Sequence, residues 1–190
     1  MASSDRMPPL DPKTMTPAQA KVAQALAAGP RGGVKGPFIP LLRSPELMDR
    51  LQKVGEYLRF HSALQARISE FVVLVVARQW TQQFEWFVHV PLALDAGVKP
   101  ETIASLAQGR RPDSMAADEE IAYDFCNELA QSKGVSEPTY RHALRQFGEQ
   151  GVVDMLGVLG YFTTVSMVMN VAHTPPPKDD RVTPLRSLPL

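Results

Sequence analysis

The sequence predicts one all-α domain with an irregular segment at each end. The 190 residues are 44% hydrophobic, which is enough for a single domain with a substantial core. Apolar residues recur at helical spacing through the middle of the chain, and no alternating run with hairpin turns interrupts them. Of the 17 prolines, 13 lie before residue 46 or after residue 173, so the middle is free to be regular. We therefore expect an N-terminal extension with a short helix at 1–30, a helical domain at 31–173 and a proline-rich tail at 174–190.

The first helices are placed by their capping residues. Thr16-Pro17 predicts the start of a short helix that ends near Gly29-Pro30. The stretch GPFIPLL that follows is predicted to be an extended, anchored loop. Ser44-Pro45 then starts a longer helix. The apolar stripe of that helix is predicted to be Leu47, Leu51, Val54 and Leu58.

About seven or eight helices are expected in total. Apolar spacing predicts the later ones at about 63–79, 81–96, 100–108, 116–132, 136–149 and 151–172. Gly97 ends the helix before it, and Gly151 divides the last two. The helix at 63–79 is expected to bury Ile68, Val72, Val75 and Val76. The tail has too few apolar residues at helical spacing to form a core element, so it is predicted to be disordered or an arm lying on a neighbour.

Composition disfavours several classes of partner. A formal net charge of zero and a pI near 6.9 give no reason to expect nucleic acid or an anionic membrane surface. The single cysteine, Cys126, excludes an internal disulfide and a cysteine metal cluster. The first residues lack the apolar core of a signal peptide, so we expect a cytoplasmic protein. The segment 151–172 is long enough to span a bilayer, but it contains Asp154 and three glycines, so a buried central helix is preferred.

The stretch QFEWFVHV places a carboxylate and an imidazole four residues apart in apolar surroundings. In a helix, Glu85 and His89 point to one face. One interpretation is a surface pair that stabilises the helix by about a few tenths of a kcal/mol. The other interpretation is functional. A buried carboxylate must be paired, and it raises the pKa of a neighbouring histidine, which keeps that histidine available as a proton donor near neutral pH.

The residues around this pair raise three further questions, which concern metal binding, the effect of Pro91 and the role of Glu70. Metal binding is disfavoured and no metal is expected, because the zincin pattern needs a second histidine and the di-iron pattern needs Glu-x-x-His in duplicate. Pro91 produces either a simple kink or a helix bent around a pocket. Glu70 opens the apolar run EFVVLVVA. It is either paired locally with Arg67 or a buried acid that orients a catalytic histidine.

The segment ISEFVVLVVARQWTQQFEWFVHVPLALDAGV, followed by KPETIASLAQG, resembles the signature of the carboxymuconolactone decarboxylase / AhpD-like superfamily. The upstream glutamate, the Glu-Trp-x-x-His helix and the Ala-Gly stop match its decarboxylase-like branch. The resemblance covers about residues 30–172 and is most specific in the middle. The peroxidase branch carries Glu, then Cys-x-x-Cys, then His, and its cysteine positions fall on Gln82 and Glu85 in this chain. Dithiol peroxidase activity is therefore disfavoured, because it needs an attacking and a resolving sulfur.

The resemblance implies an AhpD-like fold and a cofactor-independent lyase or isomerase of the carboxymuconolactone decarboxylase type. Such an enzyme acts on a small carboxylated or enolisable substrate in the breakdown of aromatic compounds. It implies His89 as proton donor or shuttle, Glu85 as the group that tunes it, and Glu70 as orienting group or second acid/base. It also implies a homo-oligomer, a trimer or a hexamer. Residues expected to bind substrate are Gln82, Trp86, Arg78 and Arg43.

Two rival functions come from other classes. The first is a non-catalytic helical oligomer whose pocket binds a small ligand, or whose Glu85–His89 pair is merely structural. The second is a redox protein that uses Cys126, although this residue is expected to be a small core side chain. A buried pair that opens into a cavity favours the enzyme, whereas an exposed pair on a flat helix face favours the structural interpretation.

Overall fold

The computed structural model describes residues 5–187, and within them it is entirely helical, as predicted. A short 3-10 turn, Pro12–Thr14, precedes the α-helices. The eight α-helices in this range are α1 (Pro17–Ala28), α2 (Phe38–Leu41), α3 (Pro45–Phe60), α4 (Ala66–Gln79), α5 (Gln83–Asp95), α6 (Pro100–Ala107), α7 (Ala117–Ser132) and α8 (Glu137–Ala172).

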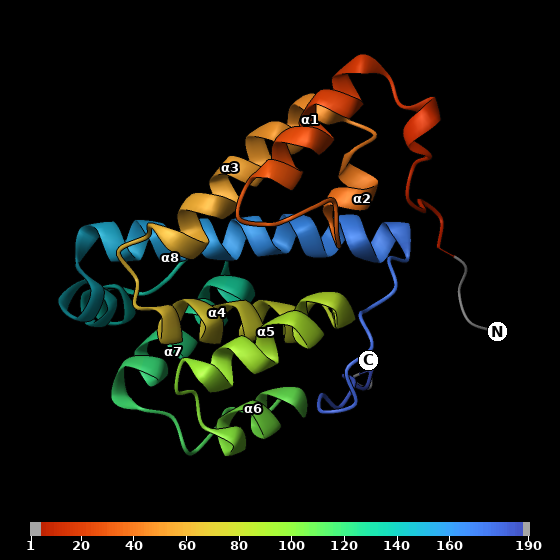
Figure 1. Ribbon diagram of the computed structural model, residues 1–190. Coiled ribbons are helices and arrows are strands. Elements are labelled where there is room, and N and C mark those ends of the chain that lie inside the picture. The colour runs from red at the N-terminus through yellow and green to blue at the C-terminus, as the bar shows by residue number, and fades with distance from the viewer. Residues whose placement is uncertain (1–4, 188–190) are drawn as a thin grey trace.

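The long helix α8 runs through the middle of the molecule (Figure 1), with α1, α2 and α3 on one side of it and α4, α5 and α6 on the other. It packs against α2, α3, α4 and α7. A break occurs at Gly148, whose φ of 69° and ψ of 174° interrupt the helical backbone. The predicted division at Gly151 is therefore three residues late. Gly151 itself lies within regular helix, and Gly148 is the residue that supplies the left-handed φ.

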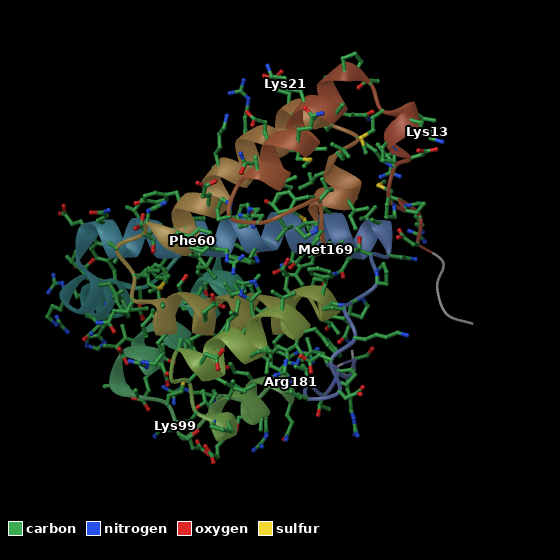
Figure 2. The ribbon with its side chains drawn as sticks, viewed as in Figure 1. Lys13, Lys21, Phe60, Lys99, Met169 and Arg181 are labelled. Atoms are coloured by element: carbon green, nitrogen blue, oxygen red, sulfur yellow. The ribbon has the colours of Figure 1, made fainter. Side chains whose placement is uncertain are left out.

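Helix α4 is the most deeply buried element. Every residue from Phe71 to Arg78 is buried, because α5, α6, α7 and α8 all pack around this helix. The predicted burial of Ile68, Val72, Val75 and Val76 is confirmed. Met169 of α8, labelled in Figure 2, is fully buried in the same core.

The start of α5 is fixed by a side-chain cap. The side-chain oxygen of Gln82 accepts hydrogen bonds from the backbone N–H groups of Phe84 and Glu85, which satisfies two of the free donors at this helix end. Pro91 lies inside α5, and the helix continues past it to Asp95. This cap sets the rotation of α5, and therefore the direction in which Glu85 and His89 point.

Two local predictions in the N-terminal third need correction. The stretch GPFIPLL contains the one-turn helix α2, because Phe38, Leu41 and Leu42 turn inward to form a second small core. The predicted stripe on α3 is rotated. Leu58 is buried, but Leu47 and Val54 are 48% and 46% exposed.

Helix α8 is the one helix among the described residues that is long and apolar enough to cross a membrane. More than half of its most apolar window, 56%, is buried inside the protein. Its buried carboxylate, Asp154, accepts hydrogen bonds from the Ala63 N–H at 2.7 Å and the Tyr57 hydroxyl at 3.1 Å. These contacts join α8 to α3 and to the loop that follows α3, so the carboxylate is satisfied inside the protein.

The described part of the tail is ordered and lies against its own chain, beside α5 and α6 (Figure 1). The indole N–H of Trp86 donates to the Thr183 carbonyl at 3.1 Å. The Gln83 amide donates to the Leu185 carbonyl at 2.7 Å and accepts from its N–H at 3.0 Å. Side chains of α5 thus hold the tail through its backbone. The tail can therefore pack against the domain without apolar residues at helical spacing.

Candidate active site

Three titratable side chains meet at the contact between α4 and α5. His89 Nδ1 lies 2.5 Å from Glu70 Oε2, and His89 Nε2 lies 3.1 Å from Glu85 Oε2. Glu85 and His89 are one helical turn apart on α5, and Glu70 reaches them from α4. The side chains of His89 and Glu85 are 3% and 5% exposed, and that of Glu70 is 15% exposed. The structure therefore brings together all three side chains to which the resemblance gave a catalytic role.

The histidine is held in its charged form. Burial alone would lower the pKa of His89, but the negative charge and hydrogen bonds of Glu70 and Glu85 outweigh that effect and raise its pKa to about 9. Near neutral pH the side chain is an imidazolium that donates from both ring nitrogens to carboxylates. It holds a proton that it can release, and Glu85 receives one of its two N–H groups.

A cavity of about 280 Å³ opens against this group of side chains. Glu85, Val88 and His89 line it from α5, and Tyr161, Phe162 and Val165 line it from α8. The ring of Phe162 meets the imidazole edge to face, at 5.1 Å between centroids and an interplanar angle of 86°. Glu70 is absent from the lining, so it supports His89 from behind while Glu85 and His89 face the space.

The rest of the lining is mostly apolar but includes three cationic side chains, none of which was predicted from the sequence. Arg31 and Lys35 come from the loop before α2, and Arg59 comes from the end of α3. Burial lowers the pKa of Arg31 and raises the pKa of the Tyr161 phenol to about 12. Only the tertiary fold brings these segments to α5. The one local signal in the sequence is a basic pair set among glycines in the stretch PRGGVKG.

Three of the predicted substrate-binding residues, Gln82, Arg78 and Arg43, lie outside the lining of the His89 cavity. The Gln82 side chain caps α5 and donates to Asn170 on α8 at 3.1 Å. Arg78 donates to the carbonyls of Ala107 and Arg186 and to the Thr81 hydroxyl. The Arg43 side chain donates to the carbonyls of Ile39 and Pro8. The structure thus places all three side chains in contacts that hold segments of the chain together, and none of them lines the cavity at His89.

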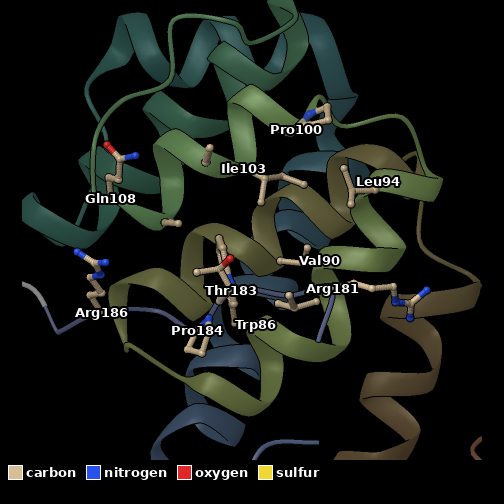
Figure 3. A pocket seen from close by; sticks show the side chains of 13 residues that line it. Trp86, Val90, Leu94, Pro100, Ile103, Gln108, Arg181, Thr183, Pro184 and Arg186 are labelled. Atoms are coloured by element: carbon tan, nitrogen blue, oxygen red, sulfur yellow. The ribbon is translucent and has the colours of Figure 1, made fainter. Parts of the chain in front are cut away.

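Trp86 faces a second, larger cavity of about 650 Å³ on the opposite side of α5 (Figure 3). The cavity lies between α5, α6 and the tail, with Val90, Ile103 and Thr183 among the residues around it. Trp86 was predicted to line the same pocket as Glu85 because the two residues are adjacent in the sequence. On a helix, adjacent residues point about 100° apart, so they face different cavities.

Two alternatives left open by the sequence are decided by contacts. Arg67 pairs with Asp118 at 2.7 Å and Glu119 at 2.6 Å, while Glu70 contacts His89, so the local Arg67–Glu70 pair is not formed. Cys126 is buried, and burial raises the pKa of its thiol to about 12. A thiol with that pKa is a poor nucleophile.

In residues 5–187, no group of three or more His, Cys, Asp or Glu side chains is arranged to hold a metal ion.

A known protein family matches the part of the chain that carries these three side chains. Residues 45–122 match the model of the carboxymuconolactone decarboxylase family, and this range contains Glu70, Glu85 and His89. No curated protein sequence matches the chain.

Two solved structures share the whole fold. One is an uncharacterized peroxidase-related protein from Ralstonia eutropha JMP134, described as an alkylhydroperoxidase AhpD core. It has a TM-score of 0.72 and 15% identity, and the match covers 93% of each chain. The other is an uncharacterized peroxidase-related protein from Silicibacter sp. TM1040. It has a TM-score of 0.71 and 16% identity, and the match covers 93% of this chain and 95% of that one.

At these identities the likeness to the solved structures shows the fold, which is the predicted AhpD-like fold. Together with the match over residues 45–122, it supports the resemblance to the carboxymuconolactone decarboxylase/AhpD-like superfamily. The predicted resemblance is confirmed at that level.

Proposed function

We propose that the protein is a cofactor-independent acid–base lyase or isomerase, similar to 4-carboxymuconolactone decarboxylase. One observation carries the proposal: a buried imidazolium, paired with two carboxylates, faces a cavity large enough for a small substrate. Titratable groups with perturbed pKa values in a concave site are typical of acid–base catalysts. A merely structural pair would not need the open space beside it.

The proposed reaction needs only a proton. The bond between the carboxylate carbon and the substrate breaks, CO2 leaves, and the electron pair remains on the substrate as a delocalised carbanion. A proton from the enzyme then forms the new C–H bond, and solvent returns a proton to the enzyme. General acid catalysis of this kind contributes about 100- to 10,000-fold.

The contacts of His89 support a division of roles. His89 carries the proton, because its pKa of about 9 keeps it charged at neutral pH. Glu85 both contacts Nε2 and lines the cavity, so the proton reaches substrate from Nε2 when Glu85 turns aside, or through the Glu85 carboxyl. Glu70 fixes the ring through Nδ1 and does not touch the substrate. Glu70 is thus a positioning residue.

Peroxidase activity is the alternative that the two solved structures raise, since both are described as peroxidase-related. The superfamily resemblance places Gln82 and Glu85 at the cysteine positions of the peroxidase branch. Gln82 caps a helix, and Glu85 contacts His89. The only cysteine of the sequence, Cys126, is buried and has a pKa of about 12. These observations disfavour dithiol chemistry.

The test is turnover of 4-carboxymuconolactone by the purified protein, followed as substrate loss and CO2 release. We expect turnover in the wild type, a fall in kcat of about 100- to 10,000-fold in His89→Gln, and a smaller fall in Glu70→Gln. His142→Gln, which replaces an exposed histidine on α8, is the matched control. Full turnover by His89→Gln would refute the proposed role of His89. No turnover by a well-folded wild type would remove this substrate and leave the non-catalytic ligand-binding oligomer as the better reading.

We also propose that the protein is cytoplasmic and forms a homo-oligomer. Apolar side chains on the outer faces of α3 and α8 support the assembly. Val153, Val171, Leu47 and Phe60 are each about half exposed or more, at 64%, 59%, 48% and 50%. Faces of this kind are commonly buried between subunits.

A further inference from the structure

Within residues 5–187, two arginine side chains that line the His89 cavity form no ion pair. Nε and Nη2 of Arg31 and Nε of Arg59 are buried without a hydrogen-bond partner. Among the described residues, neither arginine and no nitrogen of Lys35 lies within ion-pair distance of a carboxylate, whereas Arg50, Arg67 and Arg141 on the helices do. Buried cationic donors left without partners are costly, and a site that binds an anion is a usual reason for them.

The fold holds Arg31 firmly in place. Its guanidinium carbon lies 4.7 Å from the centre of the Phe38 ring. Gly55 on α3 leaves the space it needs, because a Cβ there would lie 2.8 Å from Arg31 Nη2 and 2.3 Å from Tyr161 Oη. The Tyr161 hydroxyl stays protonated, since burial raises its pKa to about 12, so it remains a donor beside the guanidinium. Arg31 and Tyr161 therefore lie side by side at the cavity, each with donor groups.

The charges that line the cavity favour an anion. Arg31, Lys35 and Arg59 are permanent cations, whereas Glu85 is the one carboxylate in the lining and is already bonded to His89. We propose that Arg31, with Arg59 beside it, binds a carboxylate of the substrate and so selects anionic substrates. A planar guanidinium with free N–H groups matches a carboxylate in geometry and charge.

The inference rests on the proposed function in one respect. If the reaction is a decarboxylation, the carboxylate that Arg31 binds cannot be the one that leaves as CO2. A cation that held the departing carboxylate would stabilise it more than neutral CO2, and would therefore slow its loss. Arg31 instead binds a second anionic group, so that the reacting carbon lies toward Glu85 and His89. The preferred substrate class is thus a small unsaturated ring that carries a spectator carboxylate.

The test uses benzoate, a small planar carboxylate, and benzamide, its neutral counterpart, with binding measured by isothermal titration calorimetry. We expect the wild type to bind benzoate with a Kd below about 1 mM and benzamide much more weakly. Arg31→Gln should weaken benzoate binding about 10- to 100-fold and leave benzamide binding unchanged. Arg31→Lys should recover part of the loss. Arg50→Gln, an exposed arginine of α3 that pairs with Glu46, is the matched control and should bind benzoate like the wild type.

The binding measurements alone decide the inference, and turnover is used only to separate it from the proposed reaction. Equal affinity of wild type and Arg31→Gln for benzoate, with both folded by thermal melting, would overturn it. So would equal affinity of the wild type for benzoate and benzamide, or no saturable benzoate binding. If Arg31→Gln loses benzoate binding while no lactone is turned over, the anion site stands and the proposed reaction fails. If His89→Gln abolishes turnover while Arg31→Gln still binds benzoate fully, the reaction stands and the anion site fails.

Discussion

At the scale of residues, His89 resolves a conflict between burial and charge. A buried charge without partners costs several kcal/mol, so burial by itself favours neutral imidazole. Here each ring nitrogen faces a carboxylate, one from α4 and one from its own helix. The paired charges outweigh burial, and the pKa of His89 rises to about 9. The site thus holds a proton at a buried position where a neutral histidine would otherwise be expected.

This pKa predicts how stability depends on pH. The folded pKa lies above the unfolded value of 6.5, so the contribution of His89 is fully present below about pH 6.5 and is lost as the pH rises through about 9. The free energy of unfolding, measured with urea at several pH values, should fall between pH 6.5 and 8.5 by at most about 1.4 kcal/mol per pH unit. His89→Gln should remove this slope. A slope that is the same in both proteins would contradict the assignment.

The residues of the site differ in how far the sequence predicts them. Glu85 and His89 are one turn apart on one helix, and Glu70 opens the apolar run of the preceding helix, so local spacing and the family resemblance were enough to find them. Arg31, Arg59 and Tyr161 come from three separate segments, and only the packing of α3 and α8 brings them to α5. Arg43 and Arg78 were named because a carboxylate needs a cation, but helical periodicity does not reveal which cation reaches the cavity.

Gly55→Ala tests the shape of this cavity with a single methyl group. The new Cβ would lie 2.3 Å from Tyr161 Oη and 2.8 Å from Arg31 Nη2, so both side chains must move. We expect a loss of stability of about 1–3 kcal/mol, as for other overpacked sites, together with weaker benzoate binding. Thermal melting and calorimetry measure the two effects. Gly134→Ala is the control, because a Cβ there meets no atom within 4 Å. Unchanged binding in Gly55→Ala would show that Arg31 does not need its present position.

At the scale of elements, the predicted helix starts hold where a capping residue acts locally. Thr16 and Gln19 form a capping box at the start of α1, and Pro45 begins α3 as predicted. The errors occur where tertiary packing decides. Helix α2 forms because Phe38, Leu41 and Leu42 enter a small core, and the tail is held by side chains of α5. Neither contact can be predicted from the spacing of apolar residues in the segment that it holds.

The contact between α5 and the tail predicts the effect of Gln83→Ala. This change removes two hydrogen bonds to the backbone of Leu185, at 2.7 Å and 3.0 Å. Each is worth about 0.5–1.5 kcal/mol net, so the tail should open about tenfold more often. Limited trypsin digestion should then cut faster after Arg181 and Arg186, whereas Gln79→Ala, at an exposed glutamine of α4, should leave the rate unchanged. Equal cutting of the wild type and Gln83→Ala would show that Gln83 does not hold the tail.

At the scale of the whole molecule, the outer face of α8 predicts self-association. Val153, Leu156, Met167 and Val171 follow one another at helical spacing and are all exposed, at 64%, 42%, 41% and 59%. Burying a valine side chain contributes about 1.5–3 kcal/mol. Sedimentation velocity should therefore show an oligomer for the wild type and a smaller species for Val153→Glu. Gln146→Glu, which adds the same charge at an exposed position nearby, should behave like the wild type. A monomeric wild type would contradict the proposed assembly.

The proposed reaction depends on a His89 that is charged at neutral pH because Glu70 and Glu85 lie against its two ring nitrogens. The most direct measurement is a titration of the His89 ring by nitrogen-15 NMR in protein labelled at histidine, with His89→Gln used to assign its signal. We predict a pKa of about 9, and a lower pKa in Glu70→Gln, which removes the partner of Nδ1. A pKa at or below the ordinary histidine value of about 6.5, unchanged in Glu70→Gln, would contradict the claim. Such a result would also exclude His89 as the proton donor on which the proposed reaction depends.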